Sequence, residues 1–274
     1  MSAALSGMVA IVTGGGGGIG GATAEVLAAD GAHVVITGRT KDTLERTAAR
    51  IAPKAQASGG SIAWKACDSL IEADVARIVA DAAQHWGRLD IAVNVVGGGA
   101  AGGIGPLLDC TAEGLEGTMR VNVTSAFHLI KHVAPVMIDG GGGSIVAVSS
   151  MQATEVAPRF NLYCAAKAAL EMMCKGAADE LGKHDIRVNV VRPGLTRNSS
   201  ETHLSEISDV VDAYMVQQPI QRRGESIDIA HAIRYFAGPE SSWTTGTALP
   251  VDGGNSLRRF PDLQFHWDEL AKRR

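Results

Sequence analysis

The sequence predicts an α/β fold, a doubly wound parallel sheet with helices on both of its faces. Short apolar runs rich in Val and Ile alternate with longer stretches that have a helical pattern, and this alternation is typical of βαβ units. The runs are apolar throughout rather than at every second residue, as expected for strands that are buried on both faces. The expected strands are residues 8–13, 34–37, 61–66, 90–96, 144–149 and 186–191.

Helices are expected between these strands, and two long ones follow the fourth and fifth strands. Pro53 lies near the end of the second helix and is a mild objection to its length. The chain has 274 residues and shows no linker or internal repeat, so we expect a single domain. The expected helices are residues 22–29, 41–57, 71–86, about 111–138 and about 161–183.

The domain is expected to span residues 1–255, and residues 256–274 form a C-terminal extension. Phe260, Phe265 and Trp267 lie in this extension, and a disordered tail is expected to avoid aromatic residues. We therefore expect the extension to dock, either on its own subunit or at an interface.

Composition and charge exclude several classes of protein. The net charge of -4 at pH 7 gives no electrostatic footprint for nucleic acid. None of the four cysteines forms a C-x-x-C pair, so we expect free thiols and no metal site. No apolar run reaches the roughly 18 residues that a membrane span needs. The sequence predicts a cytoplasmic protein without nucleic-acid or membrane partners.

A glycine-rich loop from Thr13 to Gly20 joins the first strand to the first helix. Glycines allow a tight turn and a close approach of the backbone to a phosphate. The helix that follows presents free N–H groups to a pyrophosphate. The run fits G-x-G-x-x-G at Gly15, Gly17 and Gly20, and equally G-x-x-x-G-x-G at Gly14, Gly18 and Gly20. It predicts a dinucleotide cofactor without saying which enzyme.

The end of the second strand bears on the choice of cofactor. Folds that use NAD place an acidic residue on the ribose about 20 residues past the glycines, but here Gly38 and Arg39 occupy that region. An arginine can meet a 2′-phosphate with a charge-assisted contact. NADP(H) is therefore favoured, and NAD(H) stays open.

A Tyr-x-x-x-Lys pair in an Ala-rich helical stretch is the strongest chemical signal. Tyr163 and Lys167 are four residues apart, so they share one helix face. An ammonium beside a phenol should lower the pKa of the phenol and make it useful as an acid or base. Ser150 ends the fifth strand and can hydrogen-bond a carbonyl oxygen as charge develops.

These features together resemble the short-chain dehydrogenase/reductase family over about residues 5–255. The resemblance implies a Rossmann fold, an NAD(P)(H) cofactor and a small carbonyl or alcohol substrate. It implies a catalytic tetrad of Asn122, Ser150, Tyr163 and Lys167. For cofactor binding it implies the residues Gly14, Gly18, Ile19, Gly20, Asp68, Asn94, Gly97, Tyr163, Lys167, Pro193 and Gly194, to which Arg39 is added on charge.

Two positions depart from the family pattern. The family usually shows Asn-Asn-Ala-Gly after the fourth strand, where this chain has Asn94-Val-Val-Gly97. The family often has Thr four positions past the Gly of Pro-Gly, where this chain has Asn198. Residues 195–225 begin with polar side chains after Pro193-Gly194, so a mobile substrate lid is expected there.

The predicted function is hydride transfer between a nicotinamide and a ketone or secondary alcohol, with Tyr163 as the general acid or base. A 3-oxoacyl thioester reductase is the first substrate hypothesis, and a sugar or steroid dehydrogenase is the alternative. A dinucleotide sensor without turnover or a methyltransferase is disfavoured, because neither needs Tyr163 and Lys167. A homotetramer is expected through the two long helices, where Leu170, Met172, Met173 and Cys174 form an apolar stretch.

Overall fold

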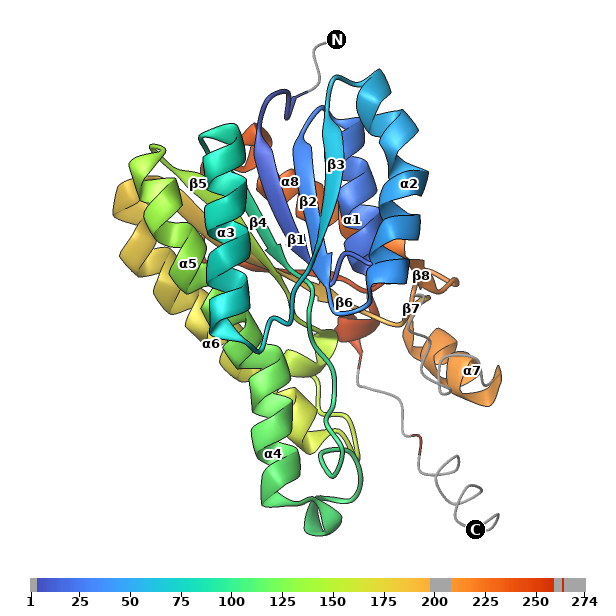
Figure 1. Ribbon diagram of the computed structural model, residues 1–274. Helices are drawn as coiled ribbons and strands as arrows, with labels where there is room; N and C mark the ends of the chain where they lie inside the picture. Colours follow the sequence, from blue (N-terminus) through green and yellow to red (C-terminus); the bar gives the residue numbers. More distant parts are fainter. Residues whose placement is uncertain (1–3, 198–207, 259–262, 264–274) are drawn as a thin grey trace.

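A seven-stranded parallel sheet forms the centre of the computed structural model, which describes residues 4–197, 208–258 and 263 (Figure 1). The strand order is β3-β2-β1-β4-β5-β6-β9. The chain therefore reverses its direction of winding between β1 and β4. The bounds are β1 Val9–Thr13, β2 His33–Gly38, β3 Ser61–Ala66, β4 Ile91–Asn94, β5 Gly143–Val148, β6 Ile186–Pro193 and β9 Ala248–Val251.

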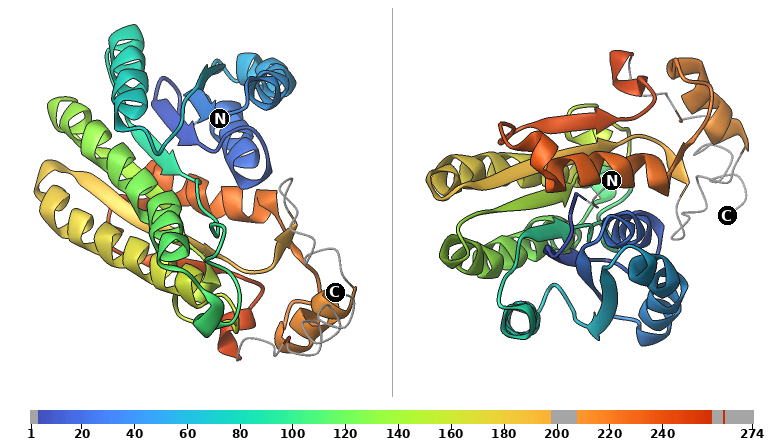
Figure 2. Two further views of the ribbon diagram at one scale, coloured as in Figure 1. Left: turned by 60° about the horizontal axis from the view of Figure 1, so that its bottom comes forward. Right: turned by 90° about the horizontal axis from the view of Figure 1, so that it is seen from above.

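Helices cover both faces of the sheet, as predicted (Figure 2). One face carries α1 (Gly18–Ala29), α2 (Lys41–Ala57) and α8 (Ser226–Ala237), and its core includes Leu27 and Phe236. The other face carries α3 (Glu72–Trp86), α5 (Ser125–Asp139) and α6 (Asn161–Leu181), and its core includes Leu129 and Leu170. Helix α2 has the predicted bounds and continues through Pro53.

All six predicted strands are present, and β9 was not predicted. It has four residues and includes Pro250, which reads against a strand in the sequence. Val190 N donates to Thr247 O at 2.9 Å and Gly194 N to Val251 O at 3.1 Å. These carbonyls face β6, so the alternate residue Pro250 turns its backbone to the open edge of the sheet. The missing N–H therefore costs no hydrogen bond in the ladder.

The predicted single helix over about 111–138 is wrong in one respect. It consists of α4 (Ala112–Met119), a π-helical segment (Arg120–Thr124) and α5. A π turn widens the helix by one residue and is frequent at functional sites. Asn122 lies in this segment and is fully buried.

Helix α6 exposes less apolar surface than the sequence predicts. Leu170 and Cys174 are 0% and 1% exposed and belong to the core under their own helix. Met173 packs partly against the same core. Only Met172 of the four predicted residues is open, at 67% exposed, and Phe127 on α5 is 46% exposed. The predicted apolar stretch of α6 therefore leaves mainly Met172 available for subunit contact, because the sheet-facing side chains are already covered.

The segment predicted as a lid is described in part. Strand β7 (Thr196–Arg197) pairs with β8 (Gly224–Glu225), and α7 (Ser208–Gln217) lies between them in the chain. Residues 198–207, including Asn198, lie outside the described residues, so the mobility of the lid stays a prediction. No helix within the described ranges is long and apolar enough to cross a membrane.

One residue of the C-terminal extension is described, and it is buried. Leu263 is 4% exposed and packs with Met151, Val210 and Tyr214. Leu263 thus lies in one cluster with residues of α7 and of the segment after β5 of its own subunit. Phe260, Phe265 and Trp267, on which the docking prediction was based, lie outside the described residues.

Candidate active site

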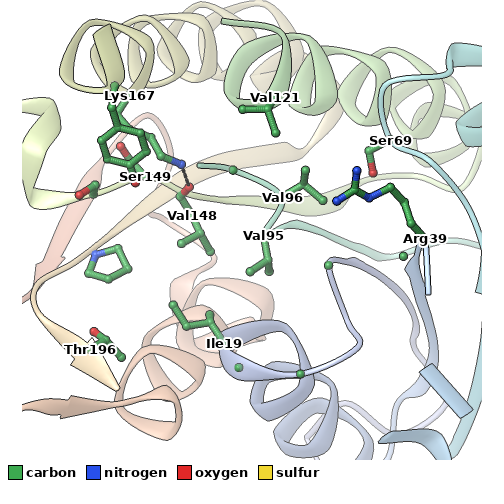
Figure 3. A pocket seen from close by; sticks show the side chains of 18 of the residues that line it. Ile19, Arg39, Ser69, Val95, Val96, Val121, Val148, Ser149, Lys167 and Thr196 are labelled. Carbon is green, nitrogen blue, oxygen red and sulfur yellow. Dashed lines mark hydrogen bonds between the residues drawn. The ribbon is translucent and has the colours of Figure 1, made fainter. Parts of the chain in front are cut away.

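A cleft of about 550 Å³ crosses the carboxyl ends of the strands at the point where the winding reverses. Open α/β sheets bind ligands at this place. Arg39 and Lys167 lie far apart along it (Figure 3). Its lining includes Gly14, Gly18, Ile19, Arg39, Asp68, Gly97, Ser150, Tyr163, Lys167, Pro193 and Gly194 of the predicted site residues.

The glycine loop lines the cleft, and its backbone is packed too closely to leave room for side chains. Gly14 and Gly18 have φ angles of +68° and +54°, which L side chains rarely adopt. A Cβ on Gly20 would lie 2.1 Å from Gly14 O. Gly20 does not line the cleft itself but lets the loop close tightly against α1. The first turn of α1, all within the described residues, holds no acidic side chain, so its positive end can meet a phosphate.

Arg39 and Asp68 line one end of the cleft. Within residues 4–197, 208–258 and 263, Arg39 has no hydrogen-bond or ion-pair partner, and it is exposed. Asp68 Oδ1 accepts a hydrogen bond from Leu70 N at 3.0 Å, which fixes the turn after β3. A free guanidinium at this end fits an anionic group on the cofactor.

Asn94 lies behind the cleft rather than in it. It is 2% exposed and accepts a hydrogen bond from Thr13 Oγ1 at 3.1 Å. Its Nδ2 donates to Val96 O at 3.3 Å. Asn94 therefore joins the ends of β1 and β4 where they diverge. Val95 and Val96, which replace the usual family residues, line the cleft.

Asn122 fixes the backbone that follows β4. Its Nδ2 donates to Gly98 O at 2.6 Å and to Thr118 O at 2.8 Å, and its Oδ1 accepts from Gly98 N at 3.1 Å. A Cβ on Gly97 would lie 2.7 Å from Lys167 Nζ and 2.8 Å from Asn122 Oδ1. The absence of a side chain at Gly97 thus leaves the space that Asn122 Oδ1 and Lys167 Nζ occupy.

Tyr163 and Lys167 lie on the cleft-facing side of α6, as their spacing predicts. Lys167 Nζ donates to Val148 O at 2.9 Å (Figure 3). It lies 5.6 Å from the centre of the Tyr163 ring. Ser150 follows β5, and its hydroxyl accepts from Gln152 N at 3.2 Å. The structure therefore brings Ser150, Tyr163 and Lys167 to one end of the cleft.

Burial dominates the titration of this pair. It raises the pKa of Tyr163 to about 12, and hydrogen bonding to Ser150 acts in the opposite direction. Burial also lowers the pKa of Lys167 to about 8, against the charges of Cys174 and Glu171, which raise it. In the protein groups alone, burial is therefore the largest cause acting on Tyr163, and the lowering of its pKa by Lys167 stays a prediction. At neutral pH the phenol carries its proton.

A second cavity of about 320 Å³ adjoins the cleft. The two share Ser150, Tyr163, Pro193, Gly194 and Thr196. Of the described residues that line the second cavity, none is charged. The remainder of its lining is Gly98, Gly99, Ile104, Met151, Gln152, Phe160, Leu195 and Tyr214.

Sequence reasoning missed two hydroxyl residues of the cleft. Ser149 lines it, and its buried Oγ has no hydrogen-bond partner among the residues that the structure describes. Such an orphaned hydroxyl fits a polar ligand in the cleft. Thr196 also lines it and donates to Gly194 O at 3.0 Å. Only the adjacency of these residues to Ser150 and Pro193-Gly194 could have drawn attention to them.

Comparison with known proteins identifies relatives that share this fold. The family model described as enoyl-(acyl carrier protein) reductase matches residues 14–256. The chain is 34% identical over 252 residues to 7alpha-hydroxysteroid dehydrogenase of Escherichia coli (strain K12), covering 91% of this chain and 94% of that protein. A short-chain type dehydrogenase/reductase from Mycobacterium ulcerans superposes with a TM-score of 0.92 at 35% identity, covering 97% of this chain and 95% of that one.

The chain belongs to the short-chain dehydrogenase/reductase family. A solved 7alpha-hydroxysteroid dehydrogenase, in complex with NADH and 7-oxo glycochenodeoxycholic acid, superposes with a TM-score of 0.85 at 32% identity, covering 92% of this chain and 96% of that one. As a short-chain dehydrogenase/reductase, the protein is an oxidoreductase that binds NAD(P)(H) and acts on hydroxyl groups. The glycine loop, the helix end and the orphaned Ser149 hydroxyl fit such a cofactor.

Proposed function

We propose that the protein transfers hydride between NADP(H) and a ketone or secondary alcohol at the junction of the two cavities. The observation that carries this proposal is the set of residues shared by the cleft and the second cavity. Ser150 and Tyr163 bring hydroxyl groups to this junction. A cofactor in the cleft and a substrate in the second cavity would therefore meet beside a proton donor.

Each protein group has a defined task in the proposed reaction. The cofactor supplies or accepts the hydride. In the direction of reduction, Tyr163 gives its phenolic proton to the carbonyl oxygen, and in oxidation it takes the alcohol proton. Ser150 holds the same oxygen by a hydrogen bond. Lys167 offers positive charge to the developing phenolate, and Asn122 keeps the loop at Gly97 and Gly98 in place.

The substrate that we favour is uncharged and apolar around its carbonyl, such as a cyclic ketone or steroid. Ile104, Met151, Phe160 and Leu195 supply apolar walls, and Gln152, Thr196 and Tyr214 supply polar groups. A 3-oxoacyl thioester is the second candidate, supported by the description of the matching family model.

The decisive experiment compares the wild type with Tyr163→Phe on a panel of 7-oxo steroids, cyclic ketones, sugars and 3-oxoacyl thioesters. We expect the variant to lose about 10²–10⁴-fold in kcat, the usual contribution of a positioned acid or base. Its Kd for NADPH, measured by fluorescence, should stay within about twofold. A variant that keeps most of its kcat would show that another group moves the proton.

Arg39 should give the preference for NADPH over NADH. Losing one charge-assisted contact costs about 1.5–3 kcal/mol, so Arg39→Ala should weaken NADPH binding by about tenfold or more and leave NADH unchanged. The matched control is Arg46→Ala on α2, which removes the same charge outside the cleft. Equal losses for both cofactors, or a wild-type preference for NADH, would contradict this role.

A further inference from the structure

A buried ion pair lies directly behind the tyrosine and lysine of α6. Arg192 Nε donates to Glu171 Oε1 at 2.7 Å, and Arg192 Nη2 donates to Glu171 Oε2. The Glu171 and Arg192 side chains are only 7% and 18% exposed. The pair joins α6 to β6. A two-point contact between a planar guanidinium and a carboxylate fixes orientation as well as distance.

The two partners lead to different parts of the proposed site. Glu171 is one helical turn after Lys167, so both side chains lie on the same buried face of α6. Arg192 directly precedes Pro193 and Gly194, which line both cavities. Arg192 is therefore adjacent in sequence to the Pro193-Gly194 turn, and Glu171 is one turn of helix away from Lys167.

Stability alone does not account for this ion pair. Removing two charges from water costs about as much as their attraction returns, and apolar pairs of similar volume are often as stable or more stable. Strand β6 is already held by backbone pairing to β5 over residues 186–191 and to β9 over residues 190–193. What the pair adds is a fixed geometry between α6 and the end of β6.

The turn after Arg192 has little room to adjust by itself. A Cβ on Gly194 would lie 2.7 Å from the Cα of Asp252, so the turn is packed closely against the end of β9. Gly194 N also donates to Val251 O at 3.1 Å. A change in the position of Arg192 would therefore be passed to the turn at the junction of the cavities.

We propose that Glu171 is a positioning residue that, through Arg192, holds Lys167 and the Pro193-Gly194 turn in one arrangement for hydride transfer. This inference rests on the roles proposed above for Tyr163 and Lys167. The end of the cleft with the glycine loop and Arg39 is formed by other elements, β1, α1 and β2. Loss of the pair should therefore impair the hydride step and leave cofactor affinity nearly intact.

The test is the double variant Glu171→Leu, Arg192→Met, which replaces the charges by apolar volume. We expect kcat to fall at least tenfold while the Kd for NADPH stays within threefold and Tm within a few degrees. The primary isotope effect on kcat, measured with NADPH that carries deuterium at the transferred C4 hydrogen, should rise, because a misaligned hydride step becomes rate-limiting. Glu171→Asp keeps the charge and shortens its reach, so it should give a smaller loss of kcat in the same direction.

The matched control is Asp30→Leu, Arg234→Met, at a partly buried ion pair between α8 and the end of α1. This variant should leave kcat and the isotope effect unchanged. The proposal is overturned if both Glu171 variants keep the kcat and the isotope effect of the wild type. It is also overturned if the control variant loses as much kcat as the test variant for the same fall in Tm. Turnover of the wild type and its loss in Tyr163→Phe test the proposed function separately, since neither depends on Glu171.

Discussion

Replacing Lys167 with methionine should make the folded protein more stable while it stops turnover. The Lys167 side chain is 2% exposed, and burial lowers its pKa from 10.5 to about 8. A folded-state pKa below the unfolded one means that folding disfavours the charged form. Methionine has a similar length and no charge, so it avoids this cost.

The size of the effect follows from the shift. One pKa unit corresponds to 1.36 kcal/mol, so a fall from 10.5 to about 8 amounts to about 3 kcal/mol at pH 7. The lost hydrogen bond to Val148 O offsets about 1 kcal/mol of this. The net gain of about 2 kcal/mol corresponds to a rise in Tm of roughly 4–8 °C for a protein of this size.

The pH dependence of this gain identifies its cause. Below pH 8 lysine is charged in both states, and the advantage of methionine is complete. Between pH 8 and 10.5 the unfolded state binds more protons than the folded state, so the wild type gains stability and the difference closes. Urea unfolding of both proteins at pH 7, 9 and 10.5 measures this directly.

The matched control is Lys175→Met, at an exposed lysine on the same helix. This substitution should change the free energy of unfolding by less than about 0.5 kcal/mol, as is usual for surface positions. A Lys167→Met protein that is no more stable than wild type at pH 7, or whose advantage does not change with pH, refutes the reasoning.

Three further predictions concern other parts of the site and the surface. Gly97→Ala should lower kcat at least tenfold in steady-state assays, because its Cβ would displace Lys167 Nζ and Asn122 Oδ1; an unchanged kcat contradicts the close packing. Leu263→Asp should raise KM for apolar ketones, because Leu263 packs on Met151 and Tyr214 beside the second cavity; a wild-type KM contradicts this. Phe127→Glu should reduce the mass of the proposed tetramer in light scattering, and a wild type that is already monomeric rules out the tetramer.

The sequence predicts the central sheet well because the signal for its strands is local. Runs such as residues 9–12 and 34–36 are apolar throughout, and burial on both faces explains that pattern. Strand β9 escapes this reasoning, because its four residues include Pro250 and its pairing partner lies about 60 residues away. The π turn around Asn122 likewise depends on the contacts of that side chain with Gly98, which no spacing reveals.

Charge chemistry was the hardest part of the site to predict. The spacing of Tyr163 and Lys167 places both on one helix face, as found, but it does not predict how deeply the two side chains are buried. That depth decides the direction of both pKa shifts. Glu171 shows the same limit, because its partner Arg192 is distant in sequence and the two meet only through the packing of α6 on β6.

Pro250 has a consequence for how copies of the protein can associate. An open strand edge invites another strand to extend the sheet, which is a common route to aggregation. On β9 the outward backbone positions are Ala248 and Pro250, and Pro250 offers no hydrogen there. A neighbouring chain would find an acceptor without its donor, so a sheet continuous across two subunits is disfavoured at this side. Association there depends more on side chains, whose shapes can be matched to one partner.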